Sequence, residues 1–168
     1  LVDQLIAGSV SSNVLGKGGT GSVGTTITTQ SDLLELRDFY KELATRIIPP
    51  GKYAGNAVYG TLDCPEILYV PGDLEWSGVI SGAGILVVDG QLLMEGHVDW
   101  QGIVIAVSGD VELNLGSSGS PEIMGTALIG SGNSTTTSVK INGNPQIKYS
   151  HDVLETVLQK LSLLSVEI

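Results

Sequence analysis

The residues of this chain best suited to chemistry are carboxylates that follow short, repeated aliphatic segments. Asp73 and Asp110 come directly after the glycines that end two such segments, and Gln91 holds the same place after the segment between them. A second pair, Asp89 and Asp99, could meet across one circuit of a coiled chain. Carboxylates gathered on adjacent turns are what the hydrolysis or elimination of a glycosidic bond would require.

These carboxylates lack the partners that such chemistry needs. A lyase also requires a basic group, and no Lys or Arg occurs between Lys52 and Lys140. No long insertion walls off a cleft. Weak calcium capture is an open alternative, although the glycine–aspartate nonapeptide of calcium-binding solenoids is missing. We therefore interpret the aspartates as solvated turn residues and predict a protein without enzymatic activity, cofactor or resident metal.

Two tryptophans stand before turn glycines, Trp76 in EWSG and Trp100 in DWQG. An indole there could stack against a sugar ring, but filling a corner of the core is the role we favour. Cys64 is expected to pack as a small hydrophobe, and His97 and His151 show no metal-ligand spacing. The candidate surface residues are thus Trp76, Trp100, Asp73, Asp89, Asp99 and Asp110.

Composition argues against nucleic acid as a direct partner. The formal net charge is −10, and residues 53–139 contain ten acidic residues and no basic one. Such a surface repels phosphate backbones and releases no counterions on binding them. A dinucleotide-like pattern at Gly19, Gly21 and Gly24 is followed by a β-branched run instead of a helix, so we attribute it to chance in a glycine-rich chain.

The elements that must position these residues are short strands that repeat along the chain. Aliphatic segments begin at Ile67, Ile85 and Ile103, 18 residues apart, and a looser fourth begins at Thr126. This spacing is too short for a doubly wound sheet, whose units need about 30 residues. It suits a chain that coils on itself and pairs each circuit with the next. We predict a mainly β protein, a short parallel β-solenoid (β-helix) of about four to five rungs over residues 53–150.

An amphipathic helix is predicted before the solenoid, over residues 31–50. Asp32 and Glu35 form an acidic version of the capping box, and apolar residues then recur every three to four positions until two prolines end the pattern. The basic residues of this segment, among them Arg37 and Lys41, lie off the apolar stripe and are expected in solvent.

A second amphipathic helix is predicted over residues 151–168, where Asp152 and Glu155 repeat the capping signature. Residues 1–30 are rich in Gly, Ser and Thr and form an extended lead-in. The whole chain is expected to be one domain. The two helices should cover either the open ends of the solenoid or one of its side walls, because uncovered strand edges invite pairing with other chains.

Four segments carry a family resemblance: YVPGDL (69–74), SGAGILVVDGQLLMEGHVDWQGIVIAVSGD (81–110), MGTALIG (124–130) and IKYSHDVLE (147–155). Across residues 55–158 the sequence resembles PilX-type accessory proteins of bacterial type IV pili. The resemblance implies an extracytoplasmic domain held by an N-terminal hydrophobic helix. No run of about 20 apolar residues occurs here, so any such anchor is expected upstream of Leu1. The glycine-cornered rungs also resemble, more weakly, bactofilin-type polymer-forming proteins.

These observations predict a non-enzymatic structural or adhesion module of a type IV pilus-like assembly at the cell surface or in the periplasm. Its partners would be other pilus or envelope proteins, and the isolated domain would be a monomer without membrane contact of its own. A bactofilin-like cytoskeletal polymer-former, which would be cytoplasmic, is the first alternative. A carbohydrate-binding or polysaccharide-degrading β-helix protein is the second. Sealed solenoid ends favour the pilus-like module. Apolar exposed end rungs favour the polymer-former, and a cleft lined by carboxylates favours the carbohydrate protein.

Overall fold

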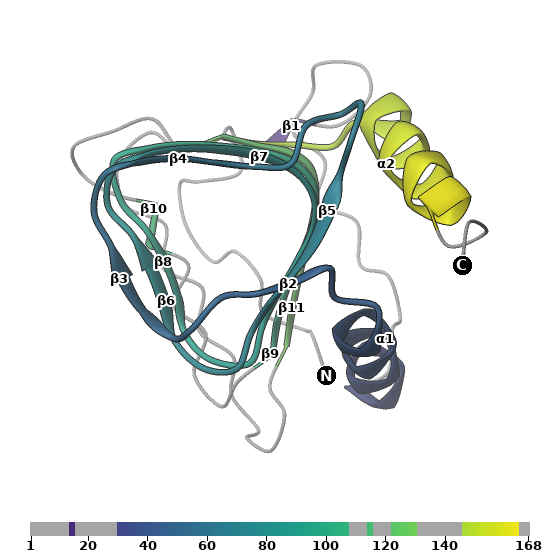
Figure 1. The fold of residues 1–168 in the computed structure, drawn as a ribbon, viewed down its shortest axis with the longest axis horizontal. Helices are drawn as coiled ribbons and strands as arrows, with labels where there is room; N and C mark the ends of the chain where they lie inside the picture. Colours follow the sequence, from purple (N-terminus) through teal and green to yellow (C-terminus); the bar gives the residue numbers. More distant parts are fainter. Residues whose placement is uncertain (1–13, 16–29, 108–113, 116–121, 131–145, 165–168) are drawn as a thin grey trace.

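The fold was described from a computed structural model that covers residues 14–15, 30–107, 114–115, 122–130 and 146–164. Asp110, the glycine pattern at 19–24 and most of the lead-in lie outside these ranges. Within them the chain forms a parallel β-solenoid of about three turns, with two helices beside it (Figure 1). The predicted fold class is confirmed, and the number of turns, about three, is lower than the four to five rungs predicted.

Two parallel sheets build the solenoid. The larger has the order β1-β12-β11-β9-β7-β5-β2, with β4 also paired to β7, and the smaller has the order β10-β8-β6-β3. The strands of the larger sheet are β1 (Val14–Leu15), β2 (Arg46–Ile47), β4 (Asn56–Tyr59), β5 (Glu66–Val70), β7 (Val79–Val88), β9 (His97–Val107), β11 (Glu122–Gly130) and β12 (Gln146–Lys148). Those of the smaller sheet are β3 (Gly51–Tyr53), β6 (Leu74–Trp76), β8 (Leu92–Met94) and β10 (Asn114–Leu115).

The repeated segments stack in register, as the sequence predicted. Ile67 pairs with Ile85, and Ile85 pairs with Ile103, in parallel strands. The looser fourth segment keeps the same register, since Thr126 pairs with Ile103. The equal spacing of the repeats therefore corresponds to one circuit of the solenoid, and residues at the same position of each repeat form columns along its axis.

A column of glycines bends the long strands into two walls. Gly84, Gly102 and Gly125 are register partners in β7, β9 and β11, and all have positive φ, between 135° and 142°. A Cβ at any of them would overlap the carbonyl oxygen of the neighbouring rung. Only glycine satisfies both the backbone conformation and this close approach. The bend gives the solenoid a three-sided cross-section (Figure 1).

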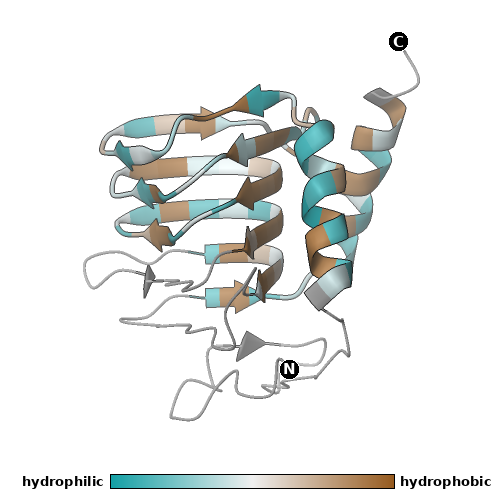
Figure 2. Ribbon diagram, turned by 90° about the horizontal axis from the view of Figure 1, so that it is seen from below, coloured by the Kyte–Doolittle hydropathy of each residue, from teal (hydrophilic) through white to brown (hydrophobic). Residues whose placement is uncertain are grey.

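The three walls differ in what covers them. The covered wall consists of β5 and the parts of β7, β9 and β11 that follow the bend, and both helices pack against it (Figures 1 and 2). The polar wall consists of β4, the parts of β7, β9 and β11 that precede the bend, and β12. The short-strand wall is the smaller sheet.

The first helix is shorter than predicted. α1 spans Gln30–Glu42, and the solenoid begins at Arg46 instead of at residue 53. The chain leaves the helix because Thr45 N donates to Ile67 O (2.9 Å) and Ile48 N donates to Tyr69 O (2.8 Å). The prolines that follow favour an extended backbone before them, so the apolar stripe that continues to Ile48 belongs to the first rung and not to the helix.

The second helix, α2, spans His151–Leu164. Its cap differs from the prediction: Val153 N donates to Ser150 Oγ (3.3 Å), so Ser150 is the capping residue and Asp152 lies in the first turn. Both helices lie beside the stack of rungs, along the covered wall, and neither closes an end (Figure 2). In the described part of the chain, no helix is long and apolar enough to cross a membrane.

The covered wall is buried on both faces. Leu68, Leu86 and Val104 point into the solenoid interior, while Ile67, Ile85 and Ile103 point outward into a second core shared with the helices. Val157 of α2 is fully buried in that second core. A strand covered on both sides has no reason to alternate polar and apolar residues, which explains why the repeated segments are continuously aliphatic.

Candidate functional site

The two tryptophans belong to the core and not to the surface. Trp76 and Trp100 have no exposed area, so their candidacy as surface residues is wrong. Tyr59 stacks on Trp76 with the ring centres 5.5 Å apart, and Trp100 packs against Trp76 at 5.9 Å with the two ring planes tilted by 38°. No ring face is left for a sugar.

Gly82 explains how this stack fits. In the polar wall Tyr59, Gly82 and Trp100 are register partners in successive rungs. A Cβ at Gly82 would overlap the Trp100 ring. The middle rung thus has no side chain at this position, and Trp76, from the short-strand wall, supplies the aromatic ring between the other two. Close packing of this kind requires the small residue and the large one together.

Asp89 lies where α1 meets the covered wall, and it has basic partners that sequence reasoning missed. Tyr69 Oη donates to Asp89 Oδ2 (2.6 Å), Arg37 Nη1 lies 3.5 Å from Oδ1, and Lys41 Nζ lies 3.9 Å from Oδ2. Lys41 also sits 5.0 Å from the centre of the Tyr69 ring. Arg37 and Lys41 were expected in solvent. Lys41 is exposed as expected, with 45% of its side chain accessible, whereas Arg37 is less exposed than expected, at 23%, because α1 turns it toward Asp89.

The protonation of Tyr69 and that of Lys41 have different causes. Burial, and then the hydrogen bond to Asp89, raise the pKa of Tyr69, so the phenol stays protonated and donates. The hydrogen bond with Tyr69 and the neighbouring negative charge raise the pKa of Lys41, so the amine stays cationic. The Asp89 carboxylate is therefore held between one neutral donor and two cations. This arrangement joins the helix to the wall.

Asp73 makes a different kind of contact, between rungs. Its Oδ1 accepts a hydrogen bond from the backbone N of Gln91 (2.8 Å). Asp73 and Gln91, which follow the glycines of successive segments, are therefore joined across adjacent turns by a side-chain-to-backbone hydrogen bond, while Asp110 lies outside the described residues. Gly90 completes the contact, because a Cβ there would overlap Asp73. The Asp73 carboxylate thus supports the turn that follows it along the chain.

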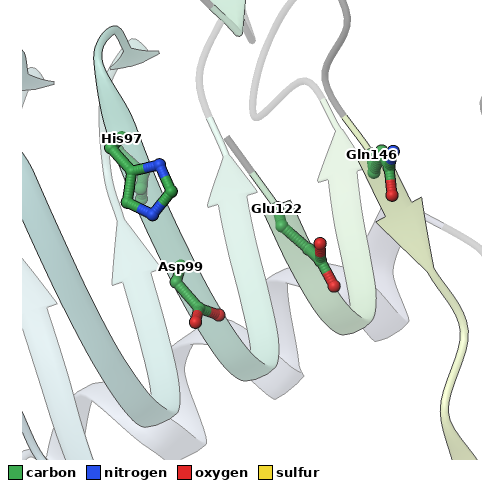
Figure 3. Close-up of a pocket in the computed structure, with 5 residues that line it drawn as sticks. His97, Asp99, Glu122 and Gln146 are labelled. Atoms are coloured by element: carbon green, nitrogen blue, oxygen red, sulfur yellow. The ribbon is translucent and has the colours of Figure 1, made fainter. Parts of the chain in front are cut away.

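Asp99 lies on the polar wall, apart from Asp89. The predicted meeting of these two residues is wrong, since Asp89 follows the covered wall and the bend separates that wall from β9's first half. Asp99 is instead the register partner of Glu122. The two carboxylates, with His97, Val98 and Gln146, line an open depression of about 220 Å³ (Figure 3). Glu122 also accepts a hydrogen bond from Lys148 Nζ (3.1 Å).

Glu122 could have been found from the sequence. It stands four residues before Thr126, as Asp99 stands four residues before Ile103. Because the repeats set the register, equal offsets place the two carboxylates side by side. Like charges in directly paired positions destabilise a sheet, and the Lys148 amine offsets part of that repulsion.

Basic residues pair with acids of the neighbouring rung elsewhere as well. Arg46 Nε lies 3.0 Å from Glu66 Oε2, and Lys52 forms an ion pair with Glu75, its register partner. The described residues include no group of three or more His, Cys, Asp or Glu side chains arranged to hold a metal ion.

Cys64 is exposed, contrary to the expected apolar packing. A tight turn, in which Thr61 and Cys64 exchange two backbone hydrogen bonds, places the thiol on the outside of a corner. His151 is exposed at the start of α2, with its Nε2 3.8 Å from Glu155 Oε2. The two histidines lie at different places in the fold and form no common site.

Asp89, Asp73 and Asp99, the singled-out carboxylates that the structure describes, are thus spread over three places: a helix contact, a turn between rungs and a shallow depression on the polar wall. Comparison with protein-family models, with curated proteins and with solved structures finds no match to this chain.

Proposed function

We propose that the chain is a non-enzymatic structural or adhesion module of a type IV pilus-like assembly at the cell surface. The observation that supports the structural role is that most charged side chains named above hold elements of the fold together. Asp89 joins α1 to the covered wall, Asp73 supports the next turn, and Arg46, Lys52 and Lys148 each pair with an acid on an adjacent rung. Side chains engaged in holding the scaffold together are poorly placed to move protons or bind a substrate.

The difference between the covered wall and the polar wall supports the same role. The helices cover one wall and leave the polar wall free of described elements, so one rigid face carries the outward side chains of successive rungs in regular columns. Rigid, regularly spaced surfaces are what contact modules present to partners. The pilus-like setting and the extracytoplasmic location rest on the sequence resemblance over residues 55–158.

Two measurements test the proposal. The purified chain should cleave none of a panel of neutral and acidic polysaccharides, with or without calcium. Reproducible cleavage that is lost in Asp99→Asn or Glu122→Gln, but kept in Asp73→Asn, would support the carbohydrate alternative and refute the structural one. The setting is tested by shearing and fractionating cells that express the protein. Recovery in the soluble cytoplasmic fraction alone would contradict it.

A polymer-former remains the second candidate, because one observation favours it. The first rung ends both sheets, and two of its outward side chains are exposed: Ile47 (66%) and Val58 (65%). Apolar end strands of this kind could stack against another copy. Electron microscopy of the chain in dilute buffer distinguishes the two: filaments would favour the polymer, and single particles the module.

A further inference from the structure

The first rung, formed by β2, β3 and β4, offers an unpaired strand edge. β2 and β3 are terminal strands of their sheets, and β4 pairs with β7 alone among the described strands. At the opposite end of the larger sheet, β1 pairs with β12. The first rung lies at the near end of the stack in Figure 1, and no described strand lies on its outer side. Its outer backbone groups are therefore available to an added strand.

The three strands of this rung are not equally open. Pro49 and Pro50, between β2 and β3, have no N–H to donate, and Arg46 and Lys52 put charges on those strands. Prolines and charges are the usual means by which natural sheets protect an edge. β4 carries neither, which makes it the unprotected strand of the rung.

The exposed residues of β4 are Asn56 and Val58, so Val58 gives the outward face of this strand one apolar side chain. Val58 pairs with Ser81, and Val79 pairs with Asn56, so the two valines are diagonal neighbours in adjacent strands. Both are more than half exposed, at 65% for Val58 and 51% for Val79. A strand added beside β4 would cover Val58 with its own outward residue. It need not fill the interior, because the Tyr59 ring already stacks on Trp76 there.

One cation stands at the end of this strand. The Arg46 guanidinium lies 5.8 Å from the centre of the Tyr59 ring, its side chain is half exposed, and its ion pair is with Glu66 one rung below. Residues 46–62 contain no acid. The first rung thus carries positive side chains and no acid of its own, so a carboxylate on an added strand meets no like charge from this rung and can share Arg46 with Glu66. A second copy paired edge to edge would bring none, since it would offer the same acid-free rung.

We infer that β4 is a docking edge for an extended segment of a partner protein, added as a further β-strand, with β-branched residues over Val58 and a carboxylate beside Arg46. Main-chain hydrogen bonds would supply affinity, and the alternate side chains and the charge would supply selectivity. The inference is independent of the pilus-like setting, because it uses only the edge, its valines and its cation.

The test uses the full 168-residue chain and a capped peptide, acetyl-Thr-Val-Thr-Val-Thr-Glu-amide. On titration we expect the backbone amides of residues 56–59 to shift and to become protected from hydrogen exchange. A peptide with alternate N-methylated amides should not bind. Val58→Lys should weaken binding about tenfold or more, which corresponds to about 1.4 kcal/mol. The control Leu163→Lys changes an equally exposed residue on α2 and should bind as the wild type does.

The charge is tested separately. Arg46→Gln should weaken binding of the peptide that ends in Glu severalfold. It should leave binding of a peptide that ends in Gln unchanged. Thermal unfolding of each variant checks that it is folded before binding is compared. Absence of protection at residues 56–59 with millimolar peptide would overturn the inference, and so would equal binding of the N-methylated peptide. Self-association of the wild-type chain that Val58→Lys abolishes would assign the edge to a second copy and overturn it too.

Discussion

The covered wall and the polar wall share the long strands β7, β9 and β11, and they differ because only one of them is packed against helices. In β7, the residues after the bend are apolar without interruption and fully buried, while those before it alternate between the interior and the outer face. The chemistry of the backbone is the same on both sides of Gly84. The pattern of side chains therefore reports what lies against each face of a strand, in addition to reporting the strand itself.

The strongest test of this comparison places the same charge on both walls. Val87→Asp would bury an unpaired carboxylate between the covered wall and the helices, and we expect it to destabilise the fold by about 4 kcal/mol or more. Val79→Asp, in the polar-wall part of the same strand, is half exposed and should change stability by about 0.5 kcal/mol or less. Urea unfolding of both variants measures the difference. Similar losses would mean that the two walls are equally buried.

The contribution of the helix is tested at α2. Val157 is fully buried against the covered wall, whereas Leu158, the next residue, is 42% exposed. Val157→Asp should cost about 3 kcal/mol and release the helix, while Leu158→Asp should cost about 0.5 kcal/mol. Far-ultraviolet circular dichroism and urea unfolding follow the two effects. A larger loss in Leu158→Asp would show that α2 is rotated relative to this description.

The bend between the walls can be tested at a glycine. Gly102 combines positive φ with a close approach to the neighbouring rung, while Gly55 has a similar φ of 146° and open space around it. Gly55→Ala measures strain alone, about 1 kcal/mol, and Gly102→Ala adds the overlap, for about 3 kcal/mol in total. Equal losses in thermal unfolding would remove the close approach as a cause of the glycine column.

The smallest effect is a pH dependence at the helix contact. Burial and the hydrogen bond to Asp89 raise the pKa of Tyr69 above its ordinary value of 10.0. The folded protein then holds a proton that the unfolded chain releases. The resulting stability is complete below pH 10 and is lost as the pH rises through the raised pKa. Unfolding measured from pH 9 to 11 should show this decline, and Tyr69→Phe should make it shallower. An unchanged slope in Tyr69→Phe would exclude the phenol as its source.

The repeated strands and their register could be predicted from the sequence, but the packing of the helices on them could not. Ile67, Ile85 and Ile103 could be aligned because their spacing is constant, and the register follows from the spacing. The end of α1 could not be predicted, because the apolar stripe continues into β2 and hydrogen bonds to β5, distant in sequence, end the helix well before the prolines. Local pattern and long-range pairing compete there, and long-range pairing prevails.

The candidate site shows the same limit. The sequence places Asp89 after a strand but gives no sign of where α1 lies, so its partners Arg37 and Lys41 were missed. The neighbourhood of Asp99 and Glu122 was within reach, since both follow from offsets inside the repeat. Contacts between columns of one repeat can be predicted from spacing. Contacts between the repeat and a separate helix depend on tertiary packing, which the spacing does not encode.

The aromatic stack makes the chain its own optical probe. Both tryptophans of the sequence are fully buried in the interior of the solenoid, and neither belongs to the core shared with the helices. Their emission should therefore be blue-shifted and should respond when the coil itself opens. Release of α1 or α2 would leave it nearly unchanged while far-ultraviolet dichroism falls. One heating experiment with two detectors can thus separate loss of the helices from unwinding of the coil.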